Sequence, residues 1–268
     1  TDVADEILSA YYDLRDRQTH VQITNISSST VTIHIQIFQH DRNCDELNFF
    51  DDLTGNDTVI YDLDNIIKND GTSAPINLLD DSYGYVVVTL IPSDTSPDNP
   101  LIGNFRILDN TGYEYRTNCS TTESGSFEDL IANFNTVDGA MYADVIGYAF
   151  DRRNLPIGVT NYDPGVTFDI FVFDLVEESL SCDSRNFACG NVMNYGINED
   201  YLNSRSGHLL CPGGGLADPN GGYISFENVN TNVGPGTPVN LLVSFIGLIG
   251  LNNNNGTGSL DHWISELE

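Results

Sequence analysis

The sequence contains almost no lysine, little tryptophan or methionine, and none of the familiar catalytic motifs. Lys68 is its only lysine, and the 268 residues include one tryptophan and two methionines. GxSxG, HExxH, a phosphate-binding P-loop and an EF-hand loop are all absent. There is also no CxxCH motif for haem c attachment. These absences exclude the classes of protein that the motifs define, among them GxSxG hydrolases, HExxH metalloproteases, P-loop nucleotide-binding proteins and EF-hand proteins.

Positive charge is scarce. Ten Lys and Arg residues face 39 Asp and Glu residues, which gives a net charge of −29. Such a surface repels nucleic acid and anionic lipid, so we predict neither nucleic-acid binding nor membrane insertion. Calcium prefers Asp and Asn oxygens, and "DLDN" (62–65) and "DDS" (80–82) are segments that would suit it as a cofactor. A generic solvating surface is the alternative, and the sequence assigns no metal ligands.

The chain begins at Thr1 without an apolar leader, which we interpret as a mature secreted protein after removal of its signal peptide. We therefore expect an extracellular or cell-surface location. The segment "LLVSFIGLIGL" (241–251) is too short to span a bilayer and is expected to be a buried strand. Four potential N-glycosylation sequons agree with secretion, at Asn25, Asn56, Asn118 and Asn255.

The five cysteines stand at positions 44, 119, 182, 189 and 211. In "CDSRNFAC" the spacing suits a small disulfide loop, so we predict a bond between Cys182 and Cys189. The odd count leaves at least one thiol unpaired or bridging to another chain.

Alternation of apolar and polar residues predicts mostly strands. "HVQITNI" and "TVTIHIQIF" alternate around a Ser/Thr tip, and "YGYVVVTLI" (83–91) is apolar enough for a central strand. "NFRILDNTGYEYRTN" is typical of a hairpin. We predict an all-β, antiparallel β-sandwich, immunoglobulin-like or jelly-roll, with further strands at 142–150, 165–175, 222–227 and 238–248.

Two segments have the periodicity of short peripheral helices. "SFEDLIANF" (126–134) has Ser126 as a possible N-cap, and "SLDHWISELE" (259–268) places Leu260, Trp263 and Ile264 on one helical face.

The domain organisation we expect is an N-terminal arm, 1–19, followed by a single large β-sandwich, 20–268. A faint echo between "TIHIQIFQHDRNCDE" and "TFDIFVFDLVEESLSC" leaves open two pseudo-repeated halves.

Few residues suggest chemistry. His34 and His40, with Asp41, Cys44 and Asp45 following, would suit a metal site, but strand alternation places positions 34, 36 and 40 on a solvent face in any case. Carboxylate pairs such as Asp62–Asp64, Asp80–Asp81 and Glu177–Glu178 would suit a glycoside hydrolase, yet 39 acids yield pairs in any chain. We predict that the protein is not an enzyme.

The segment "THVQITNISSSTVTIHIQIF", followed by "LTGNDTVIYDL", resembles secreted immunoglobulin-like or jelly-roll β-sandwich modules of bacterial and archaeal cell surfaces, including filament subunits. The resemblance covers about the first ninety residues. It implies a surface location. Some members of that group polymerise by lending a terminal strand to a neighbour, although no family-specific motif for this is present.

The arm "TDVADEILSAYYDLRDRQT" decides between functions. Leu8, Ala10, Tyr12 and Leu14 alternate as in a strand, whereas Val3, Ile7, Tyr11 and Leu14 would line a helix. A strand here pairs either with its own sheet or with a neighbouring copy. We predict the second: a structural subunit of an extracellular filament, pilus-like fibre or surface layer, with other copies of itself as partners. The alternatives are a monomeric adhesin or carbohydrate-binding module with glycan partners, and a secreted glycan-active enzyme.

Overall fold

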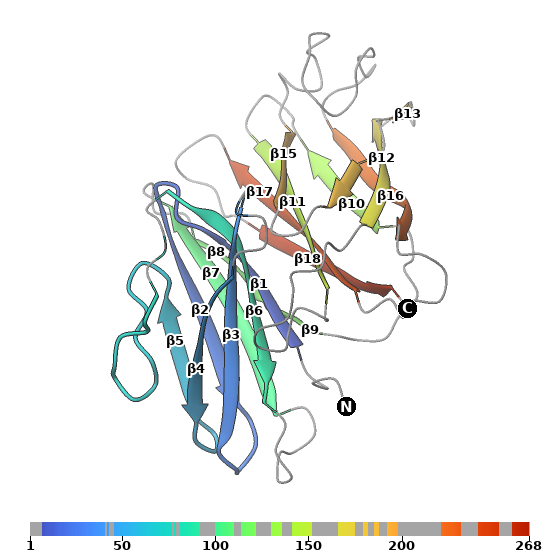
Figure 1. The fold of residues 1–268 in the computed structure, drawn as a ribbon. Helices are drawn as coiled ribbons and strands as arrows, with labels where there is room; N and C mark the ends of the chain where they lie inside the picture. Colours follow the sequence, from blue (N-terminus) through green and yellow to red (C-terminus); the bar gives the residue numbers. More distant parts are fainter. Residues whose placement is uncertain are drawn as a thin grey trace. The chain divides into compact units, whose positions relative to one another are not determined.

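The chain is all-β in this computed structural model: its strands pair antiparallel, and no helix occurs among the described residues (Figure 1). This confirms the predicted all-β, antiparallel class. Within the described residues, no helix has the length and apolar character needed to cross a membrane. The described residues are 7–40, 42, 46–76, 78, 81–91, 100–109, 114–121, 130–135, 141–151, 166–174, 179–181, 185–187, 192–197, 221–231, 241–251 and 259–267.

The chain divides into two compact units, the first made mostly of residues 1–123 and the second mostly of residues 124–268. The first unit contains two sheets (Figure 1). Sheet A has the order β4 (Glu46–Leu53), β3 (Val31–Gln39), β6 (Tyr83–Leu90), β1 (Ile7–Asp13) and β9 (Ser120–Thr121). Sheet B has the order β5 (Thr58–Asp62), β2 (Arg17–Asn25), β7 (Leu101–Asp109) and β8 (Glu114–Asn118).

The two strands around the Ser/Thr tip do not pair with each other. β2 pairs with β5 and β7 in sheet B, while β3 pairs with β4 and β6 in sheet A. Asn25 stabilises the connection between the two sheets. Its buried side-chain amide donates to the carbonyl oxygens of Ser29, Leu53 and Thr54 at 2.7, 3.1 and 3.0 Å. The chain therefore passes from one sheet to the other at the tip.

Alternate residues of the two sheets form the apolar core of the first unit. Phe49 of β4 meets Tyr61 of β5 edge to face, with ring centroids 5.6 Å apart. The Tyr61 hydroxyl donates to the buried Asp51 carboxylate at 2.9 Å, which ties sheet B to sheet A. The other buried members of this set include Leu8, Ala10, Val21, Ile23, Ile35, Ile37, Val86, Val88, Phe105 and Ile107.

Residues 7–13 of the N-terminal arm form β1, an interior strand of sheet A. β1 pairs with β6 along its whole length, from Ile7–Thr89 to Asp13–Tyr83, and on its other side Leu8 and Ser9 pair with β9. Every residue of β1 is buried. The segment is therefore a strand and not a helix. Both of the strands that it pairs with, β6 and β9, belong to the same chain.

A partly buried ion cluster centred on Asp13 stabilises the corner between β1 and β2. The Asp13 carboxylate, whose side chain is 1 % exposed, accepts hydrogen bonds from Arg15 Nε at 2.9 Å and from Arg17 Nη1 at 2.7 Å. Thr19 Oγ1 accepts from the Asp13 backbone N–H and donates to the Asp13 carbonyl. Asp16 lies between the two arginines with a φ of 55°, so the turn is tight.

The polar face of β3 is buried, contrary to the solvent-facing position predicted for residues 34 and 36. His34 is 1 % and Gln36 0 % exposed. The His34 ring stacks on Phe50 of β4, with centroids 4.5 Å apart. Burial lowers the pKa of His34, and the nearby Glu46 carboxylate and Asn48 amide oppose this only in part. Alternation identified the two faces of β3, but it did not show that both are covered.

We expect this histidine to make the fold less stable in mild acid. Its pKa in the unfolded chain is about 6.5 and its folded pKa is lower, so protons bind preferentially to the unfolded chain once the pH falls below about 6.5. The melting temperature should therefore be independent of His34 above that pH and should decline below it. His34→Phe retains the stacking on Phe50 and should flatten the decline below about pH 6.5. His40→Phe is the control; equal slopes in both variants would contradict the assignment.

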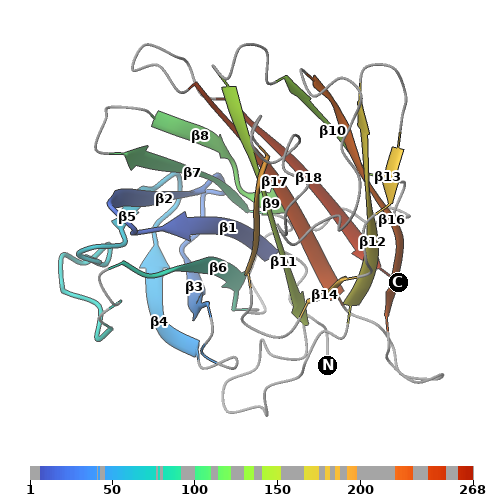
Figure 2. The ribbon, with the colours of Figure 1, turned by 90° about the horizontal axis from the view of Figure 1, so that it is seen from above.

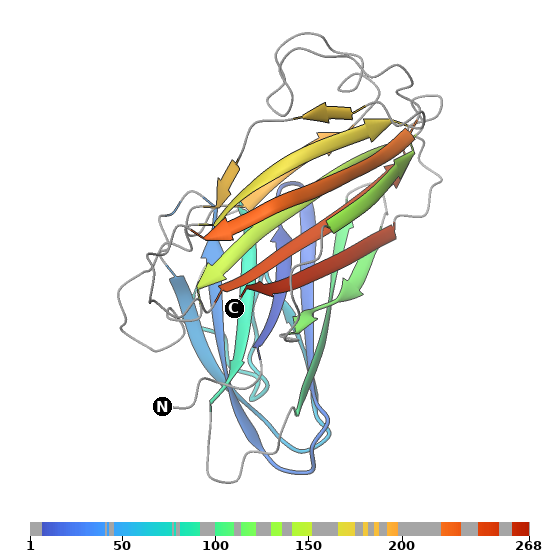
Figure 3. The same ribbon diagram turned by 90° about the vertical axis from the view of Figure 1, so that its right-hand side faces the viewer.

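The second unit also contains two antiparallel sheets (Figures 2 and 3). One comprises β10 (Leu130–Asn135), β16 (Gly221–Thr231), β12 (Val166–Asp174) and β13 (Ser179–Ser181), with β14 (Arg185–Phe187) also on β12. The other comprises β15 (Val192–Ile197), β11 (Met141–Asp151), β17 (Leu241–Leu251) and β18 (Ser259–Leu267). These confirm the strands predicted from residue 142 onward, including the strand at 241–251.

Both predicted peripheral helices are wrong in the described residues. Residues 259–267 form β18, which pairs with β17 from Ile249–Ser259 to Leu241–Leu267. Residues 130–134 belong to β10, which pairs with β16. A helix of nine residues is marginal in isolation, so pairing with a neighbouring long strand outweighs helical periodicity.

Candidate functional site

The predicted interface residues of the arm lie inside the chain's own fold. Leu8, Ala10 and Tyr12 are 0–1 % exposed on β1, and Leu14, just after the strand, is 6 % exposed. Of the two placements that the sequence leaves open, the single chain adopts the intramolecular one. Contact between these side chains and another copy would require β1 to leave sheet A.

The other predicted sites give little to build on. Cys182 and Cys189 lie outside the described residues. His34 and His40 stack separately on Phe50 and Tyr83. In the described ranges, no group of three or more His, Cys, Asp or Glu residues could hold a metal ion. In "DLDN" the Asp62 carboxylate instead accepts from the Asp64 backbone N–H at 3.1 Å.

The outward face of sheet B arranges its polar residues in rows across the strands. Cross-strand register places Gln22 beside Asn104, and Asn104 beside Asn118. We call this set of three carboxamides the amide row. The next pair along the strands is Thr24 beside Ile102, about 7 Å away because successive outward residues are two positions apart.

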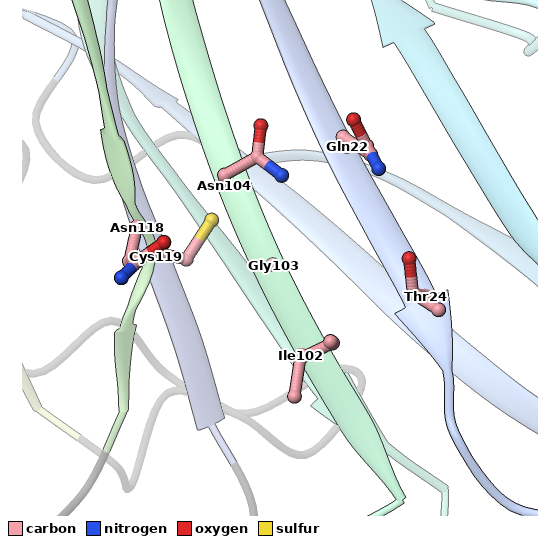
Figure 4. Close-up of a pocket in the computed structure, with 7 residues that line it drawn as sticks. All are labelled: Gln22, Thr24, Ile102, Gly103, Asn104, Asn118 and Cys119. Carbon is pink, nitrogen blue, oxygen red and sulfur yellow. The ribbon is translucent and has the colours of Figure 1, made fainter.

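A surface pocket of about 400 Å³ lies over the amide row (Figure 4). The amides of Gln22 and Asn104 make no hydrogen bond to any described part of the chain, so their donors and acceptors are available to a ligand. Ile102, 52 % exposed, supplies an apolar wall. Ile60, 54 % exposed, lies beside Gln22 on β5. The pocket thus combines the amides of Gln22 and Asn104 with aliphatic surface.

Gly103 and Cys119 shape this pocket from below. A β-carbon at position 103 would lie 2.9 Å from Cys119 Sγ and 3.1 Å from Ile23 Cδ1, so only glycine fits without displacing a neighbour. The Cys119 backbone N–H donates to the Gly103 carbonyl at 2.9 Å. Cys119 is a free, buried thiol, and burial raises its pKa to about 12. Its role here is packing, because a thiol held protonated is a poor nucleophile.

A second row lies next to the amides on the other side from Ile102. His20, Arg106 and Arg116 are neighbours across β2, β7 and β8, and we call them the cation row. Arg106 Nε donates to His20 Nδ1 at 2.8 Å, and His20 Nε2 lies 3.7 Å from Asp62 Oδ2. Arg106 Nη1 is 4.0 Å from Glu114 Oε1. Arg116 is exposed and forms no ion pair with a described residue.

The sequence indicates which residues of each strand face outward, but it does not show that they lie side by side. Polar residues at every second position of "HVQIT", "NFR" and "EYRTN" indicate outward-facing positions. Only the register between β2, β7 and β8 turns them into rows, since β2 lies some eighty residues before its neighbour β7.

Compared with known proteins, the chain matches no family model and no curated protein.

Proposed function

We propose that the protein is an extracellular binding module, an adhesin or carbohydrate-binding protein, that holds a glycan on the outward face of sheet B. The observation that carries this proposal is the amide row beneath a pocket of about 400 Å³. Sugar hydroxyls are both donors and acceptors, and so are carboxamides, which makes a row of amides well suited to them. We further propose that the two sheets of the first unit form an immunoglobulin-like or jelly-roll sandwich.

Hydrogen bonds rather than ring stacking would provide the affinity. The outward positions of the rows carry the amides, Thr24, Ile60, Ile102, His20 and two arginines, with no Phe, Tyr or Trp among them. The aliphatic side chains would contact the less polar face of a sugar ring. Without aromatic stacking we expect modest affinity at a single site, typical of modules that act through repeated contacts.

Glycan binding by the intact chain tests this function. A panel of defined oligosaccharides should yield binders, and the double variant Gln22→Ala, Asn104→Ala should weaken binding by roughly 10- to 100-fold, since each lost hydrogen bond is worth about 0.5–1.5 kcal/mol. Asn65→Ala removes an exposed amide outside the pocket and should have no effect. Absence of any binder, or equal binding by both variants, would refute the proposal.

Assembly into an extracellular filament is a second proposal. One observation favours it: β1 is joined to β2 through the short turn Leu14–Asp16, and Asp16 has a positive φ of 55°. Short, strained hinges favour exchange of the strand that they connect. Exchange predicts oligomers of the intact chain that grow with concentration in light scattering, with β1 of one copy in sheet A of the next. A strictly monomeric chain at every concentration would refute it.

A further inference from the structure

We propose that Arg106 and Arg116 form an anion-binding subsite beside the amide pocket, so that the glycan recognised here is acidic and carries a carboxylate on its sugar ring. This inference rests on the proposed glycan-binding function and names its substrate class. The register of β7 and β8 places the two arginines directly opposite each other on the outward face of sheet B.

The pairing of these arginines is unusual for this protein. Only ten of its residues are Lys or Arg, against 39 Asp and Glu. Like charges directly opposite each other on adjacent strands destabilise a sheet. Glu114 compensates Arg106 only loosely, at 4.0 Å, and Arg116 has no ion pair within the described ranges. An anion bound between the two guanidinium groups would remove this repulsion.

The neighbours of Arg106 hold its guanidinium in place. Its Nε–H is used by His20 Nδ1 at 2.8 Å, which fixes the plane of the group, while the side chain stays 40 % exposed. Apart from the 4.0 Å approach of Nη1 to Glu114 Oε1, its other N–H donors make no hydrogen bond to a described residue. A planar guanidinium with two free donors binds a carboxylate in bidentate fashion, and it is the usual choice for this ligand.

The spacing between the rows suits one sugar residue. Arg106 and Asn104 are two positions apart on β7, and Arg116 and Asn118 are two positions apart on β8, about 7 Å in each case. A pyranose ring over the amides would therefore present a ring carboxylate to the arginines.

The test compares oligogalacturonate, its methyl ester and a sulfated dextran as probes of the intact chain in titration calorimetry. We expect oligogalacturonate to bind most tightly and to weaken as salt rises. Arg116→Gln should weaken oligogalacturonate binding by roughly 10- to 100-fold, because it removes a charge-assisted hydrogen bond to the carboxylate. Binding of the methyl ester, which carries no carboxylate charge, should not change. Arg116→Lys should recover part of the loss. The matched control is Arg42→Gln, which changes the net charge equally at an exposed position on the connection after β3.

The remaining outcomes are also decisive. If neutral and acidic forms bind equally and only the amide variants weaken them, the anion subsite is refuted while the glycan-binding function stands. Tighter binding of sulfated dextran would replace the carboxylate by a sulfate ester. If no glycan binds, both proposals fail. Concentration-dependent dimers abolished by Arg116→Gln would instead assign the arginines to an acidic surface of a second copy.

Discussion

Removing residues 1–14 should unfold the first unit rather than release a folded monomer. The deletion takes away β1, whose Ile7, Leu8, Tyr11 and Tyr12 are all fully buried. At about 1.5–3 kcal/mol for each large side chain, these four contribute roughly 6–12 kcal/mol, which is comparable to the whole stability of a domain. Loss of the near-ultraviolet circular dichroism signal and of protection from hydrogen exchange in β3 and β6 would report the unfolding.

Two matched variants make this experiment specific. Deleting residues 1–6 leaves β1 intact and should preserve the melting transition. Leu8→Asp keeps the chain length and buries an unpaired carboxylate, so it should behave like the larger deletion. A folded, soluble product of the 1–14 deletion would show that β1 is dispensable, as the donor-strand hypothesis requires. A peptide of residues 1–18 that then binds this product would directly support exchange between copies.

Neutralising Asp13 should clearly destabilise the first unit. Asp13→Asn removes the buried carboxylate shared by Arg15 and Arg17, whose own side chains are 38 % and 21 % exposed. Loss of hydrogen bonds to a charged group typically costs about 1.5–3 kcal/mol. Denaturant unfolding should show this loss at pH 7. Asp16→Asn, in the same turn but exposed, should change stability by less than about 0.5 kcal/mol.

The same carboxylate predicts the direction of acid sensitivity. Burial raises the pKa of Asp13, but the hydrogen bonds and charges of Arg15 and Arg17 outweigh burial and hold it below its ordinary value. Stability from this cluster is therefore fully present above about pH 4, where an unfolded Asp is ionised, and is lost as the pH falls through the lower folded pKa. Wild type and Asp13→Asn should converge in stability at acidic pH. Parallel curves down to pH 2 would contradict this role for Asp13.

Local pattern was sufficient for the strands themselves. Period-two alternation located β2 and β3, because side chains in a strand alternate strictly between two faces. The hairpin pattern at 104–118 located β7 and β8, and the apolar run at 83–91 identified β6 as a central strand. Local pattern gave the wrong prediction at 259–267. The apolar residues there have helical spacing, but the segment forms β18. A nine-residue segment carries too little intrinsic preference to resist pairing with β17.

The sequence by itself determined that the chain is all-β, strongly acidic and free of the usual catalytic motifs. The tertiary structure alone decided that β1 pairs in its own sheet, that His34 on the polar face of β3 is buried, and that Arg106 meets Arg116 beside the amide row. The physical reason is the same in each case. Alternation is a local property of one strand, whereas strand neighbours and burial depend on contacts between residues far apart in the chain, and no local pattern specifies those contacts.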